Sequence, residues 1–295
     1  MNIHFKKVAV IGVGLIGGSL SRIMKEKGLV SCIVGIGRGI ENLKAAMEIG
    51  VIDEYTSDVR KGVKGAELVI LATPVNSILK LVEEIAPCLD RGAIITDVGS
   101  VKEEIVNSVE DILPSHLFFV GGHPIAGTER SGARASFSTL FKDRNCILTP
   151  TDRTDQGALD KIKSLWEEAG SDVTLMDTRT HDMILSTISH LPHIVAYSLV
   201  NTLLNMDDFE NILSYSAGGF KDFTRIVLSS PEMWRDIVLL NRREVLNSIT
   251  LFQNSVERLK GLIEAGDGEK ILDEFKKARE IKEMSFFGKD HNQTG

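Results

Sequence analysis

One histidine stands in a glycine-rich, polar segment that could carry out acid–base chemistry. Residues 121–132 read GGHPIAGTERSG and follow the apolar run HLFFV, which has the pattern of a buried strand. Pro124 restricts the backbone beside His123, and the flanking glycines permit tight turns. Ligands of open α/β sheets bind at the ends of strands, where an imidazole can accept a proton. The other interpretation is an ordinary turn that carries a half-exposed histidine.

A second segment has the glycine spacing of a nucleotide-binding turn. Gly12, Gly14 and Gly17 form a G-x-G-x-x-G motif between a β-branched run and a helical pattern, which is the context that a dinucleotide site requires. The three glycines would allow the turn, the approach of a pyrophosphate and close helix–strand packing. The N–H groups at Leu15 and Ile16, where the helix begins, would face the anion. We therefore expect bound NAD or NADP rather than a purely structural turn.

The residues after the next predicted strand bear on the choice between NAD and NADP. An NAD site usually has an acidic residue here to hold the ribose 2′-hydroxyl, but this chain has Gly37 and Arg38, and its nearest acid is Glu41. A guanidinium suits a 2′-phosphate. The pattern favours NADP, although Arg38 could also stack on the adenine of either cofactor.

Short apolar runs alternate with helical patterns through the first part of the chain. This alternation predicts an α/β domain with a doubly wound, Rossmann-type parallel sheet over residues 1–178. Thr73 and Pro74 follow one strand and would bind the cofactor, while Ser100 follows another and could cap the next helix or face the ligand. The expected strands are residues 7–11, 31–36, 68–72, 93–97, 116–120, 145–149 and 172–176.

The second part of the chain has helical patterns and no strand patterns, which predicts an all-α domain over residues 179–295. Its first helix, at residues 181–204, is apolar and contains Pro192, so we expect a kink. His190 and His193 lie three residues apart, and one of them could contact a substrate while the other is structural. A zinc site would need further ligands nearby, and we expect no metal.

Lys221 and Arg225 lie four residues apart and share a face of a helix that starts after two glycines. Apolar neighbours predict partial burial of this pair, where a guanidinium requires a carboxylate. A solvated surface pair is the alternative. Amphipathic helices are also expected at residues 231–263 and 268–284.

Composition and charge disfavour several kinds of partner. The 295 residues carry a formal net charge of −7, which argues against nucleic acid and anionic membranes. Three widely spaced cysteines without metal-ligand spacing are typical of a reduced, cytoplasmic protein. The chain runs directly into a strand pattern without room for a signal peptide, and no uninterrupted apolar stretch approaches a membrane span. We therefore expect a cytoplasmic protein with a small-molecule ligand.

Three longer motifs make the chain resemble the prephenate dehydrogenase family of tyrosine biosynthesis over nearly its whole length. They are GGHPIAGTE at residues 121–129, SHLPH at residues 189–193 and GGFKDFTR at residues 218–225. Three such matches in the right order are far more specific than the glycine motif. The resemblance implies a Rossmann-type domain followed by a helical domain that forms a homodimer.

The resemblance implies a reaction and two catalytic residues. The family's reaction is the oxidative decarboxylation of prephenate to 4-hydroxyphenylpyruvate with hydride transfer to NAD(P). His123 matches the catalytic histidine, which would hydrogen-bond the ring hydroxyl and accept its proton as the hydride leaves. Ser100, which matches the serine of the family's GSVK segment, would hold His123 or the same hydroxyl.

The resemblance also implies how prephenate, a dicarboxylate, would be bound. Arg225 would clamp the ring carboxylate, and Glu129 resembles the gating acid that pairs with this arginine when the site is empty. The other substrate-binding residues implied by the motifs are Thr128, Ser189, His193 and Lys221.

Three alternative functions stay open at this point. Close relatives oxidise arogenate, and no residue here decides between arogenate and prephenate. A hydroxyacid dehydrogenase or imine reductase of the same two-domain layout would use a lysine or aspartate of the helical domain, which the His123 and Arg225 segments disfavour. A non-enzymatic dinucleotide-binding protein would not need His123, Ser100 and Arg225 together.

Overall fold

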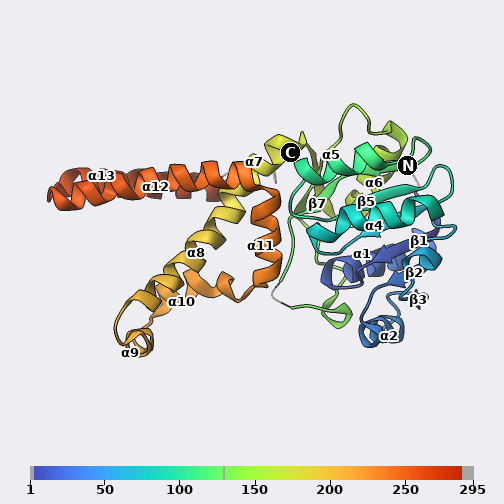
Figure 1. Ribbon diagram of the computed structural model, residues 1–295, viewed down its shortest axis with the longest axis horizontal. Helices are drawn as coiled ribbons and strands as arrows, with labels where there is room; N and C mark the ends of the chain where they lie inside the picture. Colours follow the sequence, from blue (N-terminus) through green and yellow to red (C-terminus); the bar gives the residue numbers. More distant parts are fainter. Residues whose placement is uncertain (1–2, 129, 288–295) are drawn as a thin grey trace. The chain divides into compact units, whose positions relative to one another are not determined.

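The computed structural model describes residues 3–128 and 130–287 (Figure 1). The chain divides into two compact units, residues 1–245 and residues 246–295. The first unit contains two β-sheets and most of the helices, and the second unit is helical.

A six-stranded parallel sheet in the order β3-β2-β1-β4-β5-β6 organises the first unit. This is the Rossmann-type order, in which the carboxyl ends of β1 and β4 flank the ligand-binding crevice. The predicted fold class is therefore confirmed. The strands are β1 (Phe5–Ile11), β2 (Val30–Ile36), β3 (Glu54–Thr56), β4 (Leu68–Leu71), β5 (Ile94–Asp97) and β6 (Phe118–Val120).

Helices cover both faces of this sheet because alternate residues of each strand point to opposite sides. Val8 and Val10 of β1 belong to one apolar core, whereas Ala9 and Ile11 belong to the other. The first core includes side chains of α1 (Leu15–Glu26), α2 (Ile40–Glu48) and α6 (Gln156–Glu168). The second includes side chains of α3 (Val59–Gly62), α4 (Ile78–Ile85) and α5 (Glu103–Ile112).

A second, three-stranded sheet holds β7 (Gly122–Pro124), β8 (Arg144–Leu148) and β9 (Ser171–Leu175). The expectation that residues 145–149 and 172–176 extend the large parallel sheet is therefore wrong. After β6 the chain turns at Gly121, where a Cβ would lie 2.6 Å from the Thr149 hydroxyl oxygen. The strand that follows pairs antiparallel with β8, so it starts a separate sheet, and β9 adds to β8 in parallel.

The chain then forms a long helical run from Thr178 to Asn205. It comprises α7 (Thr178–Leu185), a π-helical segment η4 (Ser186–His190), α8 (Leu191–Thr202) and η5 (Leu203–Asn205). Helix α8 begins directly after the π-helical segment, and Pro192 is its second residue. A wide turn at this point fits the proline, which lacks an N–H and would clash with a carbonyl of the preceding turn.

This run also has the length and composition of a membrane span. An 18-residue window within its 28 residues has a mean hydropathy of 1.4, and 22% of that window is buried. The sequence alone showed no uninterrupted apolar stretch of this length, because polar residues such as His190 and Ser198 interrupt it.

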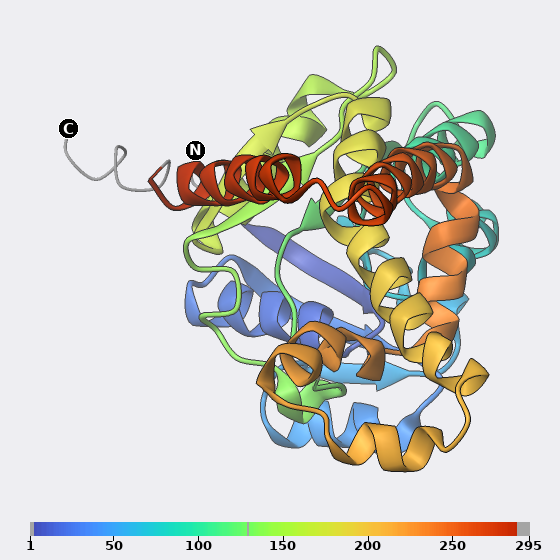
Figure 2. The same cartoon turned by 90° about the vertical axis from the view of Figure 1, so that its left-hand side faces the viewer.

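Shorter helices complete the first unit: α9 (Phe209–Ser214), α10 (Gly218–Thr224), η6 (Arg225–Leu228) and α11 (Pro231–Leu240). Helix α8 packs against α10 and η6 (Figure 2). The side chains of Trp234 and Ile237, from α11, join the second core of the sheet. The expected helix over residues 231–263 is two helices, because the chain leaves α11 at Asn241 and continues as α12 (Arg242–Glu264).

The second unit is formed by the rest of α12 and by α13 (Gly268–Phe287). An ion pair of 2.8 Å between Arg258 and Glu274 links the two helices. Gly266, with a φ of 64°, makes the turn between them.

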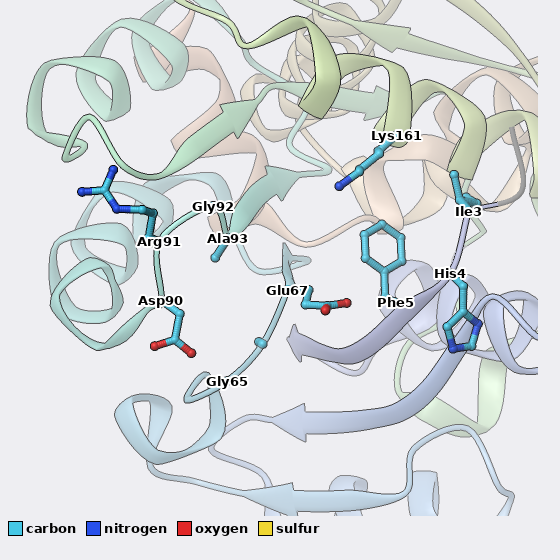
Figure 3. A pocket seen from close by; sticks show the side chains of 11 residues that line it. Ile3, His4, Phe5, Gly65, Glu67, Asp90, Arg91, Gly92, Ala93 and Lys161 are labelled. Atoms are coloured by element: carbon cyan, nitrogen blue, oxygen red, sulfur yellow. The ribbon is translucent and has the colours of Figure 1, made fainter.

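A surface cavity of about 430 Å³ lies where β1, β4 and β5 begin (Figure 3). Phe5 and Glu67 line it together with Arg91 and Lys161. Parallel strands all begin at one edge of their sheet, so this cavity lies at the opposite edge from the glycine-rich turn that follows β1. It contains none of the residues predicted to bind cofactor or substrate.

Candidate active site

The glycine-rich turn between β1 and α1 has the geometry of a pyrophosphate site. Gly12 has a φ of 96°, and a Cβ there would lie 2.3 Å from the Ala72 carbonyl oxygen. A Cβ on Gly17 would lie 2.4 Å from the Gly12 oxygen, whereas a Cβ on Gly14 would meet nothing within 4 Å. Helix α1 begins at Leu15 with no side-chain cap and no acidic residue in its first turn. Its first N–H groups, including that of Ile16, can therefore receive an anion, so the turn fits a dinucleotide.

The other predicted cofactor residues follow the two strands that flank β1. Arg38 is exposed two residues after the end of β2. Thr73 and Pro74 follow β4, and the Thr73 hydroxyl accepts a hydrogen bond of 3.0 Å from Ser77. Because parallel strands end at one edge of the sheet, the structure brings these residues to the edge where the glycine-rich turn lies.

A buried ion pair lies at the end of β5. The Lys102 ammonium donates to the carboxylate of Asp97, and both side chains are 0% exposed. The same carboxylate accepts from the backbone N–H groups of Gly99, at 2.8 Å, and Gly122, at 3.1 Å. Asp97 therefore joins the end of β5 to the residue before His123.

Ser100 lies half-buried in the loop between β5 and α5. It does not cap α5, contrary to one interpretation of the sequence. The N-cap residue is Lys102, and the carboxylate of Asp182 accepts hydrogen bonds from the backbone N–H groups of Lys102 and Glu103. The cap thus comes from α7, a different part of the chain.

His123 lies in β7, not in a loop, and its backbone pairs with Ile147 of β8. Its side chain is 9% exposed. Its Nδ1 atom lies 2.8 Å from the Nε2 atom of His181, and the Nδ1 atom of His181 lies 2.7 Å from the carboxylate of Asp182. The structure thus adds a second histidine and a carboxylate to the predicted catalytic histidine.

Burial keeps these histidines neutral. Desolvation lowers the pKa of His123 well below the ordinary value of 6.5, and the nearby His181 and Lys102 lower it further. Desolvation also lowers the pKa of His181, but the hydrogen bond to Asp182 acts in the opposite direction. At neutral pH His123 is therefore unprotonated, which is the form a general base requires.

The two histidines of the SHLPH motif have different environments. The Nδ1 atom of His193 lies 2.9 Å from the carbonyl oxygen of Ser189, and its ring stacks on Trp234 at 3.5 Å. Burial lowers the pKa of His190 to about 4, and its Nδ1 atom lies 3.2 Å from the Asn241 amide. The imidazole of His193 and the side chain of Ser189 are half-buried, whereas His190 is buried.

The predicted carboxylate-binding residues do not join this cluster within one chain. Lys221 is exposed in α10, and Arg225 is exposed at the start of η6, so the predicted partial burial is wrong for a single copy. Of the apolar neighbours that suggested burial, Phe220 and Ile226 are half-buried, whereas Phe223 is 45% exposed. Thr128 is exposed and accepts from the Arg130 N–H. Glu129 lies outside the described residues.

The sequence motifs gave no functional role to four residues of this site: Asp97, Lys102, His181 and Asp182. The sequence features that could have identified them are weak. His181 and Asp182 are adjacent near the start of the helical region, and Asp97 ends a strand five residues before Lys102. The contacts of these residues join positions up to 80 residues apart.

Sequence comparison places this site in a known family. The profile of the prephenate dehydrogenase nucleotide-binding domain matches residues 20–175, and that of the prephenate dehydrogenase dimerization domain matches residues 177–277. The chain belongs to the prephenate dehydrogenase family. A prephenate dehydrogenase of Bacillus subtilis is 38% identical over 96% of this chain and 77% of its own. A cyclohexadienyl dehydrogenase of Zymomonas mobilis is 36% identical over 94% of this chain and 95% of its own.

Solved structures of the family have the same fold. Prephenate dehydrogenase from Aquifex aeolicus, in complex with hydroxyphenyl propionate and NAD+, superposes with a TM-score of 0.91 at 38% identity, over 97% of this chain and all of that one (100%). Arogenate dehydrogenase from Synechocystis superposes with a TM-score of 0.81 at 28% identity, over 95% of this chain and 99% of its own. The prephenate dehydrogenase fold therefore extends over both sheets and the helices that follow them.

Proposed function

We propose that this chain oxidises prephenate to 4-hydroxyphenylpyruvate, with loss of carbon dioxide and hydride transfer to NAD(P), in tyrosine biosynthesis. The observation that carries the proposal is the buried imidazole of His123. Its Nδ1 atom is engaged by His181 at 2.8 Å, which leaves Nε2 for a substrate. Membership of the prephenate dehydrogenase family supports the same reaction.

His123 would act as the general base. Its neutral ring accepts the proton of the ring hydroxyl, which pushes electrons toward loss of the hydride and typically accelerates a reaction by about 10²–10⁴-fold. Ser100 would hold the same hydroxyl or the imidazole. The nicotinamide supplies the hydride acceptor. Loss of carbon dioxide then makes the ring aromatic, so the step is effectively irreversible.

The two carboxylates of prephenate would be bound by the helical part of the chain. Arg225 is our candidate for the ring carboxylate, because a guanidinium can form two parallel hydrogen bonds with it. Glu129 would pair with Arg225 when the substrate is absent. The other residues of this proposed substrate site are Thr128, Ser189, His193 and Lys221.

Prephenate and arogenate remain the two substrates to be distinguished. They differ only in a keto or an amino group on the side chain. Structural relatives carry both names, since the Aquifex aeolicus protein is called a prephenate dehydrogenase and the Synechocystis protein an arogenate dehydrogenase. The higher identity to the former, 38% against 28%, supports prephenate.

We favour NADP as the cofactor. Gly37 directly follows β2 and occupies the place where an NAD site usually has an acidic residue, and the next residue, Arg38, is exposed. The Aquifex aeolicus structure contains NAD+, so the two enzymes would differ in this preference. Replacing Arg38 with Ala should raise the KM for NADP and leave the KM for NAD nearly unchanged. Equal effects on both would point to stacking on the adenine.

We further propose a division of labour and a homodimer. Residues 1–178 would bind the cofactor, and residues 179–295 would bind substrate and form the dimer. The apolar side chains of Ile188 and Leu204 are 68% and 67% exposed in the helical run, and a second copy would cover them. We expect the protein to be a cytoplasmic dimer that binds neither membranes nor nucleic acid. Sedimentation of the purified protein without detergent should show a single dimeric species.

Steady-state kinetics test the function directly. NAD and NADP are each supplied with prephenate and with arogenate, and reduction is followed at the absorbance of the reduced nicotinamide. We expect the highest kcat/KM with prephenate and NADP. Turnover with arogenate alone would move the chain to the sister specificity. Binding of a dinucleotide without turnover in any combination would contradict the proposed reaction.

A further inference from the structure

A chain of three buried side chains runs from the candidate base into the helical region. The Nδ1 atom of His123 lies 2.8 Å from Nε2 of His181, and Nδ1 of His181 lies 2.7 Å from a carboxylate oxygen of Asp182. The two residues beyond His123 are even less accessible than it is, with exposed fractions of 0% and 1%. Water therefore has little access to either hydrogen bond.

Asp182 is held in place independently of the two histidines. Its carboxylate accepts from the backbone N–H groups of Lys102, at 2.8 Å, and Glu103, at 3.0 Å, at the start of α5. The side chain of Asn241 donates to its backbone carbonyl at 2.8 Å. The positive end of the α5 dipole favours an anion at this point. The carboxylate is thus a fixed acceptor with a fixed orientation.

The positions of the protons follow from this fixed acceptor. A carboxylate without a proton can only accept, so the Nδ1 atom of His181 must carry the hydrogen. A neutral imidazole has one N–H, which makes Nε2 of His181 an acceptor and therefore Nδ1 of His123 a donor. The remaining nitrogen of His123, Nε2, then carries a lone pair. The chain of hydrogen bonds thus selects the tautomer that can take a proton from a substrate.

We propose that His181, anchored by Asp182, is a positioning residue that holds His123 in the tautomer and orientation required of the base. This inference rests on the proposed dehydrogenase function. When His123 takes up the proton, its Nδ1–H group still points at the lone pair of His181, and the Asp182 carboxylate lies beyond it. The new positive charge is therefore stabilised without movement of the protein.

The charged and titratable groups around His181 agree with this role. Besides His123 and Asp182, the groups that act on it are Lys102, Asp97 and His190. Lys102 and Asp97 are paired with each other and shift the pKa of His181 in opposite directions. Desolvation lowers the pKa of both His181 and His190, so they are neutral at pH 7. Asp182 is the carboxylate that contacts His181 directly, and its hydrogen bond is the largest of the effects that raise the pKa of His181.

Two substitutions at one position test the proposal. His181→Leu removes both hydrogen bonds, so His123 can adopt the other tautomer, and we expect kcat to fall by about 100-fold or more while KM changes little. His181→Gln can accept from His123 and donate to Asp182, so we expect it to recover at least about 10-fold of that loss. Dinucleotide affinity and the urea midpoint, measured on the same preparations, show whether each variant is folded.

A second background separates positioning from general structural support. If His181 acts only through His123, the change His181→Leu should lower kcat no further in a His123→Asn variant. A further loss in that background would overturn the proposal, as would equal activities of the Leu and Gln variants or an unchanged kcat in the Leu variant. If the unsubstituted protein turns over neither prephenate nor arogenate, the proposed function has failed, independently of the role of His181.

Discussion

The buried pair of Asp97 and Lys102 allows a quantitative prediction about stability. Both side chains are 0% exposed, and the Asp97 carboxylate also accepts from the backbone N–H groups of Gly99 and Gly122. Removing one partner of a buried ion pair leaves the other charge uncompensated, which typically costs about 3–5 kcal/mol. We therefore expect Lys102→Met and Asp97→Asn each to lower the free energy of unfolding by at least about 3 kcal/mol.

The double variant should be more stable than either single variant. In the double variant, with Asp97→Asn and Lys102→Met, no charge remains buried. The remaining cost comes mainly from one backbone N–H group, which loses its acceptor because an amide has one oxygen where the carboxylate has two. That cost is about 1–3 kcal/mol. The two substitutions should therefore be non-additive by several kcal/mol, whereas independent sites add to within about 0.5 kcal/mol.

Urea unfolding followed by tryptophan fluorescence measures these differences. With a urea m-value of about 3 kcal/mol/M, a loss of 3 kcal/mol moves the midpoint by about 1 M. The half-exposed pair of Lys25 and Asp53, at 2.6 Å with side chains 30% and 36% exposed, is the matched control. Lys25→Met should cost less than about 1 kcal/mol. Single variants at the buried pair that cost no more than this control, or effects that simply add, would refute the reasoning.

Three further predictions concern the base, the effect of pH and the glycine-rich turn. His123→Asn should lower kcat by about 10²–10⁴-fold with a small change in KM, measured by steady-state kinetics with both nicotinamides; a proportional loss of substrate binding would contradict its role as a base. His190, with a pKa of about 4, stays neutral in the folded protein while the unfolded chain takes up a proton below pH 6.5, so stability falls as the pH falls. From pH 6.5 to 5 this group should cost about 1.6 kcal/mol, and His190→Gln should flatten the change in urea midpoint; an unchanged slope would argue against it. Gly17→Ala should lower the melting temperature because the new Cβ would lie 2.4 Å from a backbone oxygen, whereas Gly14→Ala, with nothing within 4 Å, should melt normally but bind dinucleotide more weakly. Normal dinucleotide binding by Gly14→Ala would place the pyrophosphate elsewhere.

Local sequence patterns were sufficient for the cofactor turn and for five of the six strands of the large sheet, but they did not predict the three-residue edge strand β3. The strand at residues 7–11, the glycines and the helix after them are consecutive in the chain, and each is specified by a short-range rule of spacing or conformation. The requirement for glycine is local as well, since the φ of 96° at Gly12 excludes other side chains. The same holds for the change to helical patterns near residue 179, where a period of 3.6 replaces short apolar runs.

The partners of His123, the proposed base, were determined only by the tertiary structure. His123 and His181 are 58 residues apart, and Lys102 and Asp182 are 80 apart. No periodicity reaches across such distances, because the contacts depend on how α7 packs against α5. The separate sheet of β7, β8 and β9 has the same origin, since an alternating pattern predicts a strand but not the strand with which it pairs.

The sequence by itself thus determined which residues could do chemistry, through glycine spacing, strand ends and the three motifs that indicate the family. The tertiary structure decided which of them act on one another. Asp182 caps a helix that lies far away in sequence, and this cap fixes the direction of the hydrogen bonds through His181 to His123. Hydrogen bonds require atoms within about 3 Å and a defined orientation, and only the packed fold supplies both.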